Sequence, residues 1–136
     1  MRITLLQRAR LRDPTISAMC EEYRKRFRRY GQLDIREENK PRWPEGAWRI
    51  LADERGDCLS SEAFAQQLAR WSMLHGDLCI AIGDGDGHDA DFATAAQTRI
   101  SLSPMVFPHR LAHLLMVEQI YRAGCILAGH PYHHGS

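Results

Sequence analysis

The stretch LCIAIGDGDG, residues 78–87, decides the fold class. Its first five residues are continuously apolar, which is typical of a parallel strand buried on both faces. A glycine-rich turn, residues 83–87, follows at once. Ligands of open α/β sheets bind at the carboxyl ends of such strands, where small residues let the backbone come close to them. The stretch therefore predicts a central strand of an α/β sheet and a ligand site at its end.

Strands and helices alternate along the rest of the chain. A helix at 14–29 is expected from the N-cap Asp13 and from apolar residues at helical spacing, and a second helix from an N-cap at Ser60 or Ser61 to Gly76. This alternation predicts an α/β fold. The other expected segments are strands 3–6, 33–36 and 48–52, a loop at 37–46, a turn at 53–56, helices 90–97 and 111–127, and mixed strand and loop at 99–107.

Length and composition predict one globular domain, residues 1–136. With 44% hydrophobic and 26% charged residues, the composition excludes a disordered or fibrous chain. No uninterrupted apolar run approaches the roughly 20 residues of a membrane span, and arginines begin too early for a signal peptide. A cytoplasmic protein without a membrane segment is expected. The four cysteines are far apart, so we expect reduced thiols rather than disulfides or a zinc site.

Charge divides the chain into two halves. Residues 1–56 carry 14 Lys and Arg against 9 Asp and Glu, whereas residues 57–136 carry 4 against 8 and contain all seven histidines. The outer face of helix 14–29 either forms a phosphate-binding surface or is simply solvated. The basic residues on that face are Arg24, Lys25, Arg26, Arg28 and Arg29.

The glycine-rich turn favours a ligand without phosphates. Four aspartates follow Gly83 within eight residues and would repel a pyrophosphate, and the dinucleotide fingerprint is absent. A calcium loop is disfavoured because Asp89 occupies the glycine position and Ala95 the position of the bidentate glutamate. The alternative is a glycine turn with a purely structural role.

The C-terminal segment 129–134 holds three histidines and a tyrosine. These side chains could bind a metal, act as acid and base, or stack on nucleobases, and the alternative is an exposed tail without a role. Consecutive histidines outside a helix make a poor closed metal site, so no metal ligand is assigned.

Taken in order, these segments resemble the RlmH family, the small SPOUT-class methyltransferases that modify a pseudouridine of 23S ribosomal RNA. Residues 53–65 are similar to the family's segment after its third strand, and residues 101–109 to its cofactor loop. Residues 118–123 and 129–133 resemble its closing helix and tail. The sequence departs from the family at Asp84, where a glycine is usual, and at 37–46, which is too short for the family's helix.

The resemblance implies a SPOUT-type α/β fold, a trefoil-knotted, mostly parallel sheet with helices on both faces. It also implies S-adenosylmethionine as cofactor, 23S rRNA or the assembled ribosome as partner, and a homodimer whose subunits share each active site. By matching positions, the implied catalytic residues are Arg122, Tyr132, His133 and His134. The implied cofactor-binding residues are Ala52, Ile82, Gly83, Asp84, Gly87, Ser103, Pro104, Met105, Val106, Phe107 and Pro108.

The chemistry of the residues agrees with methyl transfer to N3 of a pseudouridine. The sulfonium donor carries its own leaving group and no phosphate. N3 must lose a proton, for which His133 or a tyrosine–histidine pair is a reasonable base, and Arg122 could stabilise the resulting negative charge. Two other functions stay open: an RNA- or ribosome-binding module that has lost the cofactor, and a metal-dependent hydrolase. The hydrolase would use His130, His133 and His134, with or without His109.

Overall fold

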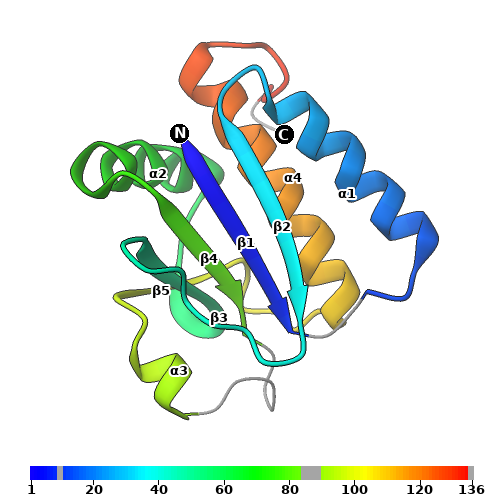
Figure 1. Cartoon of the computed structure of the whole chain (residues 1–136). Helices are drawn as coiled ribbons and strands as arrows, with labels where there is room; N and C mark the ends of the chain where they lie inside the picture. The colour runs from blue at the N-terminus through cyan, green and yellow to red at the C-terminus, as the bar shows by residue number, and fades with distance from the viewer. Residues whose placement is uncertain (9–10, 84–89, 135–136) are drawn as a thin grey trace.

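A five-stranded parallel sheet forms the centre of the protein (Figure 1). The computed structural model describes residues 1–8, 11–83 and 90–134. The strands lie in the order β2-β1-β4-β3-β5, and all four neighbouring pairs are parallel. Their bounds are Arg2–Arg8 (β1), Gln32–Glu38 (β2), Trp48–Cys58 (β3), Leu78–Ile82 (β4) and Thr98–Ser101 (β5).

The apolar stretch chosen from the sequence is the middle strand. Each of the five residues of β4 is buried, and β4 pairs with β1 on one side and with β3 on the other. Alternate side chains enter two different clusters, with Ile80 on one face of the sheet and Cys79 on the other. The prediction of a central parallel strand covered on both faces is confirmed.

The helices begin and end where local chemistry favours it. They are α1 (Pro14–Phe27), α2 (Ser61–His75), α3 (Ala90–Thr94) and α4 (His109–Ala128). Asp13 caps α1 by accepting a hydrogen bond from the Ile16 amide at 3.1 Å, and Ser60 caps α2 in the same way. Gly76 ends α2 with a φ of 79°, a conformation that suits glycine. The predicted helices are confirmed, with ends that move by up to three residues.

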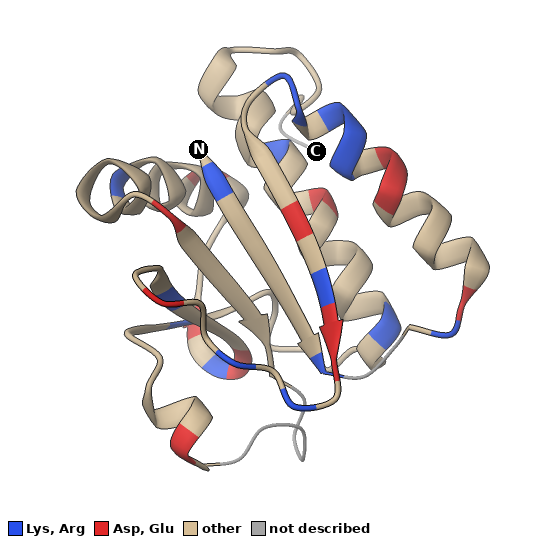
Figure 2. Ribbon diagram, viewed as in Figure 1, with Lys and Arg blue, Asp and Glu red and all other residues tan. Residues whose placement is uncertain are grey.

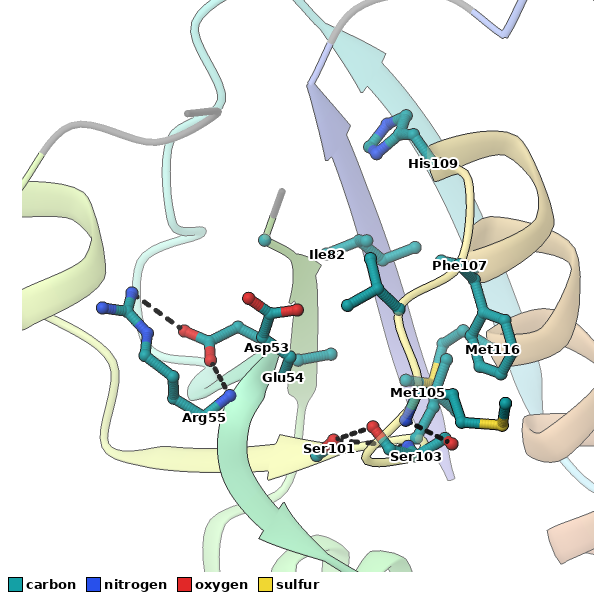
Figure 3. A pocket seen from close by; sticks show the side chains of 15 residues that line it. Asp53, Glu54, Arg55, Ile82, Ser101, Ser103, Met105, Phe107, His109 and Met116 are labelled. Atoms are coloured by element: carbon teal, nitrogen blue, oxygen red, sulfur yellow. Dashed lines mark hydrogen bonds and ion pairs between the residues drawn. The ribbon is translucent and has the colours of Figure 1, made fainter. Parts of the chain in front are cut away.

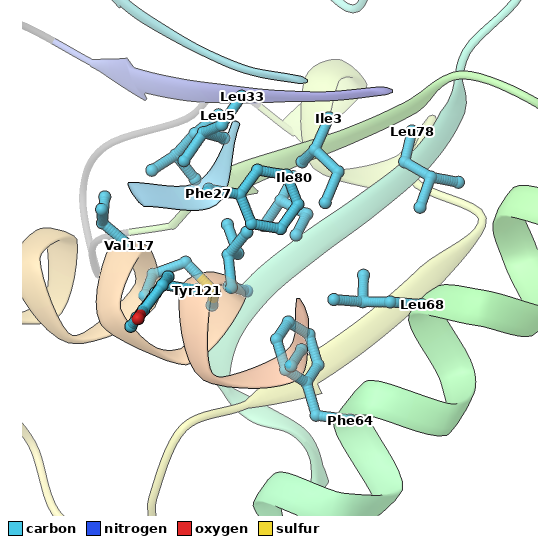
Figure 4. Packing of buried hydrophobic residues seen from close by; sticks show 14 of the residues in the cluster. Ile3, Leu5, Phe27, Leu33, Phe64, Leu68, Leu78, Ile80, Val117 and Tyr121 are labelled. Atoms are coloured by element: carbon cyan, nitrogen blue, oxygen red, sulfur yellow. The ribbon is translucent and has the colours of Figure 1, made fainter. Parts of the chain in front are cut away.

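The main core lies between the sheet and the three long helices. Phe27 of α1, Leu68 of α2 and Val117 of α4 meet the sheet residues Leu5 and Ile80 on this face (Figure 4). All five are fully buried. Because α4 packs against both α1 and α2, it is the helix that joins the layer.

The opposite face of the sheet is covered by the loop after β2 and by the short helix α3. Instead of the helix that the RlmH family places between its second and third strands, a loop follows β2, as the prolines predict. Trp43 of this loop stacks on Phe92 of α3, with ring centroids 4.5 Å apart and planes at 6°. The Trp43 indole N–H also donates to the Phe92 carbonyl at 2.9 Å. The loop and α3 thereby shield Leu6 and Leu51 from water.

The turn predicted at residues 53–56 is wrong. These residues continue β3, and the register against β5 jumps between Ala52 and Asp57, which marks a bulge. At Gly56 a Cβ atom would lie 2.6 Å from backbone atoms of Ile100. The glycine therefore permits close approach of two strands rather than reversal of the chain.

The closing helix α4 is apolar because it lies in the core. It is the one helix among the described residues that has the length and composition of a membrane span, with a mean hydropathy of 1.2 over its most apolar window. Forty-four per cent of that window is buried. Polar residues within the helix, including the buried His113, divide the apolar stretch.

Candidate active site

A cavity of about 320 Å³ opens at the carboxyl end of β4 and beside the bulge within β3, bounded by the loop that leads into α4 (Figure 3). This is the edge of the sheet where the glycine-rich turn predicts a ligand. The residues that line it are Ala52, Asp53, Glu54, Arg55, Ile82, Gly83, Ser101, Leu102, Ser103, Met105, Val106, Phe107, His109, Ala112 and Met116.

Gly83 contributes a stretch of the cavity wall that has no side chain. Its amide donates to the carbonyl of Ala52 at 2.7 Å, which holds the end of β4 against β3. A Cβ atom at Gly83 would lie 3.1 Å from the Cβ of Asp53 and 3.3 Å from the Ala52 oxygen. Because any side chain here would crowd that wall, glycine leaves backbone exposed to whatever occupies the cavity.

Serine hydroxyls shape the loop between β5 and α4. The buried hydroxyl of Ser101 donates to the carbonyl of Ser103 at 2.9 Å, and the amide of Met105 donates to the Ser103 hydroxyl at 3.0 Å. Such bonds satisfy backbone groups that neither strand nor helix can pair. They hold the loop in a conformation that lines the cavity (Figure 3).

Asp53 brings negative charge to the cavity wall. Its side chain is 9% exposed, and its carboxylate lies 3.6 Å from the Arg55 guanidinium and 3.8 Å from that of Arg99. The carboxylate also accepts from the Arg55 amide at 2.6 Å (Figure 3). These contacts balance the charge of Asp53 and brace the bulge in β3.

Most of the residues implied as cofactor ligands line this cavity. That they bind the cofactor stays a prediction. Pro104 and Pro108 are absent from the lining, and Asp84 and Gly87 lie outside the described residues, as does most of the calcium loop considered above. Asp53, Glu54 and His109 were missed. Asp53 and Glu54 directly follow the predicted strand 48–52, and residues at the end of a strand often bind ligands in α/β sheets. That pattern could have identified both residues.

A second group of functional side chains gathers on the C-terminal half of α4. Arg122 pairs with Glu118 at 2.9 Å and donates to Nδ1 of His133 at 2.8 Å. Nε2 of His133 lies 2.7 Å from a carboxylate oxygen of Glu62. The Arg122 guanidinium also lies over the ring of Tyr132, 4.9 Å from its centroid. These five residues form what we call the Arg122 cluster.

The cluster holds its ionisable groups in defined states. The hydrogen bond with Glu118 raises the pKa of Arg122, so the guanidinium stays charged. Burial, with help from a hydrogen bond to Tyr23, raises the pKa of Tyr132 to about 12, so its phenol stays protonated at neutral pH. The phenol of Tyr132 can therefore donate a hydrogen bond.

The structure brings together three of the four residues implied as catalytic. His134 is exposed and makes no hydrogen bond to another described side chain. Glu62 and Glu118 were missed as site residues. The spacing of Glu118 and Arg122, four residues apart on a helix, is a pattern that could have identified the pair. Nothing local in the sequence connects Glu62 to a histidine 71 residues later.

The Arg122 cluster does not line the cavity within the same chain. On α4 the cavity is bounded by His109, Ala112 and Met116, which share one side of the helix. Arg122 lies six residues beyond Met116, which places it ~9 Å further along the axis and on another side of the helix. Cavity and cluster are thus separate features of one subunit.

The histidine-rich tail does not form a metal site in the described part of the chain. Within residues 1–8, 11–83 and 90–134, no group of three or more His, Cys, Asp or Glu side chains is placed to hold a metal ion. His133 is committed to Arg122 and Glu62, and Nδ1 of His130 accepts from the Tyr132 amide at 3.1 Å. A metal-dependent hydrolase has no support from this geometry.

The comparison with protein families defines the class. The family described as predicted SPOUT methyltransferase matches residues 36–133, a segment that contains the whole cavity lining and the whole Arg122 cluster. A probable methylase family protein from Haemophilus influenzae shares the fold, with a TM-score of 0.59 and 8% identity, over 94% of this chain and 66% of that one. The class is that of the SPOUT methyltransferases, enzymes that use a methyl donor, and the predicted fold class is confirmed.

Relatives narrow the class to one family. A protein named ribosomal RNA large subunit methyltransferase H from Sorangium cellulosum is 40% identical over 98% of this chain and 100% of its own length. Proteins of the same name from Brucella anthropi and an Acidovorax species are 48% and 43% identical. The matched part spans 56% and 58% of those two relatives. The chain belongs to the RlmH family, and the resemblance stated from its sequence is confirmed.

Proposed function

We propose that this protein methylates N3 of a pseudouridine in 23S ribosomal RNA, using S-adenosylmethionine and acting as a cytoplasmic homodimer. The observation that carries the proposal is the cavity beside Gly83, where bare backbone and a serine-braced loop meet at the end of the central strand. Its volume of about 320 Å³ lies within the usual range for small-molecule sites. Membership of the RlmH family and the names of the relatives supply the reaction and the RNA.

The residues of the cavity fit this cofactor. S-adenosylmethionine carries no phosphate, and the wall offers both signs of charge, with Asp53 and Glu54 beside Arg55, which suits a ligand that carries a sulfonium, an ammonium and a carboxylate. Ile82 and Phe107 offer apolar area for a purine ring. When bound, S-adenosylmethionine supplies a methyl group whose sulfonium is its own leaving group.

Arg122 is the residue that acts on the RNA base in this proposal. N3 of a pseudouridine becomes nucleophilic when its proton passes to solvent, and the base then carries negative charge. A guanidinium held in place by Glu118 stabilises that charge without having to reorganise. The ring of Tyr132, beside Arg122, offers a surface for stacking.

A second copy of the chain would complete the site. Within one subunit the Arg122 cluster does not reach the cavity, whereas reacting atoms must come within about 3–3.5 Å of each other. An apolar rim beside the cavity suits contact with another subunit. Its exposed residues are Met105 (73% exposed), Val106 (77%), Leu111 (39%) and Leu115 (36%). A homodimer in which each cavity faces the partner's Arg122 cluster satisfies both observations.

The basic end of α1 would guide RNA to the cluster. Lys25, Arg28 and Arg29 are exposed and form no salt bridge with a described carboxylate. The end of α1 carries blue, basic segments in Figure 2. A row of aromatic contacts runs from this end of α1 to Arg122. It consists of Arg26 over Tyr23 at 5.9 Å, Tyr23 against Tyr121 at 5.7 Å, Tyr121 against Tyr132 at 4.8 Å, and Tyr132 under Arg122. RNA phosphates bound at α1 would thus lie next to the reacting base.

Methyl transfer to 23S RNA or to assembled large subunits tests the proposal. Arg122→Ala should lower kcat by about 10²–10³-fold, as loss of a charge-stabilising group does elsewhere, and leave the affinity for S-adenosylmethionine nearly unchanged. Arg70→Ala on the exposed face of α2 is the matched control, with wild-type turnover expected. RNA binding that is sensitive to salt and indifferent to the cofactor, with no transfer by the wild type, would instead identify a non-catalytic module.

A further inference from the structure

Four side chains from three parts of the chain form one hydrogen-bonded row. Glu118 and Arg122 come from α4, His133 from the tail and Glu62 from the first turn of α2. The row contains Glu118 to Arg122 at 2.9 Å, Arg122 to Nδ1 of His133 at 2.8 Å, and Nε2 of His133 to Glu62 at 2.7 Å. His133 is therefore the link between two charged groups of opposite sign.

The identities of the donors settle where the imidazole proton lies. A guanidinium has only N–H donors, so Nδ1 of His133 must be the acceptor and carries no proton. A carboxylate accepts only, so Nε2 carries the proton and donates it to Glu62. The arrangement is a neutral imidazole in the Nε2–H tautomer, with both ring nitrogens engaged.

This arrangement changes the role predicted for His133. A general base needs a free lone pair within reach of the proton it removes. The one lone pair of the neutral ring is used to hold Arg122, so His133 cannot take the N3 proton without releasing the guanidinium. With His133 in place, Arg122 has hydrogen bonds on two sides, from Glu118 and from the imidazole.

We propose that Glu62 is a positioning residue, which anchors the Nε2–H of His133 so that Nδ1 holds the Arg122 guanidinium in its working orientation. The proposal deepens the proposed function and rests on it for the role of Arg122. In this chain of contacts Glu62 reaches Arg122 only through His133.

The surroundings of Glu62 support the role. Its side chain is 56% exposed, yet the imidazole it contacts is only 12% exposed, so the contact closes the outer side of the cluster. The hydrogen bond from His133 lowers the pKa of Glu62, which keeps the carboxylate ionised. A contact between α2 and α4, Ser61 to Gln119 at 2.7 Å, holds the first turn of α2 beside α4.

Nuclear magnetic resonance of the imidazole N–H tests the anchor without RNA or cofactor. The wild type should show a hydrogen-bonded Nε2–H proton for His133, protected from exchange and assigned by its loss in His133→Ala. Glu62→Ala should lose the signal, and Glu62→Gln should keep it because the amide oxygen still accepts. A proton on Nδ1 in the wild type, or an unchanged signal in Glu62→Ala, would overturn the proposal.

Kinetics then test the positioning. Glu62→Ala should lower kcat about tenfold with unchanged affinity for S-adenosylmethionine, by analogy with loss of the group that orients a metal-bound histidine. Glu62→Gln should restore most of the rate, and Glu45→Ala, an exposed carboxylate on the 39–47 loop, should match the wild type. Wild-type kcat in Glu62→Ala would overturn the proposal.

A double-variant cycle of Glu62→Ala and His133→Ala tests whether Glu62 affects kcat only by positioning His133. If Glu62 acts through His133, adding Glu62→Ala to His133→Ala should change kcat by less than about twofold. A further tenfold loss in the double variant would overturn the proposal. If the wild type transfers no methyl group at all, the proposed function fails, whereas the resonance experiment still decides whether Glu62 anchors His133.

Discussion

The buried His113 should make the protein sensitive to mild acid. The side chain is 1% exposed, and burial, followed by the nearby His109, lowers its pKa from 6.5 to about 4. Between these two pH values the unfolded chain binds more protons than the folded one, so the free energy of unfolding falls as the pH falls. At about 1.4 kcal/mol for each pH unit, the loss between pH 7 and pH 4.5 is about 2.5 kcal/mol.

His113→Leu isolates this effect. Leucine has a similar volume and removes both the titrating group and the Nδ1 atom, which has no hydrogen-bond partner among the described residues, so stability at pH 7 should be equal or higher. The free energy of unfolding is measured in urea by tryptophan fluorescence at pH 7 and at pH 4.5. Between these two pH values it should fall by about 2.5 kcal/mol less in His113→Leu than in the wild type. His134→Gln, at an exposed position, should keep the wild-type loss. An equal loss in His113→Leu would refute the reasoning.

Three further substitutions test the packing and the cavity. Gly124→Ala places a Cβ atom 2.6 Å from the Tyr30 ring. Although alanine has the better helix propensity, this crowding should reduce the free energy of unfolding in urea by about 1–3 kcal/mol. A more stable variant would contradict the contact. Gly83→Val should weaken calorimetric binding of S-adenosylmethionine to the folded protein by at least about tenfold, and unchanged affinity would place the cofactor elsewhere. Trp43→Ala removes the cover over Phe92 and should cost about 2 kcal/mol in the same urea assay, whereas no loss would show that the loop is dispensable.

Local patterns were sufficient to predict the framework of the fold. The apolar run of β4 predicted its central place, and the caps Asp13 and Ser60 predicted where α1 and α2 begin. These features depend on a few neighbouring residues, so they can be seen in the sequence. The order of the strands depends on contacts between distant segments and was not predicted; the family resemblance implied only a mostly parallel, knotted sheet.

The errors and omissions have long-range causes. Residues 53–56 have the composition of a turn, but β5 pairs with the residues on both sides of them, so they form a bulge within β3. His113 is polar, yet it faces the core, because its neighbours on α4 determine which side of the helix is buried. Glu62 becomes a partner of His133 only when α2 packs beside α4.

Calorimetric titration of the purified protein with S-adenosylmethionine tests the central claim most directly, since the proposed chemistry depends on occupation of the cavity beside Gly83. Saturable binding of one cofactor per chain is the predicted result. The absence of any heat of binding at millimolar cofactor would contradict the account.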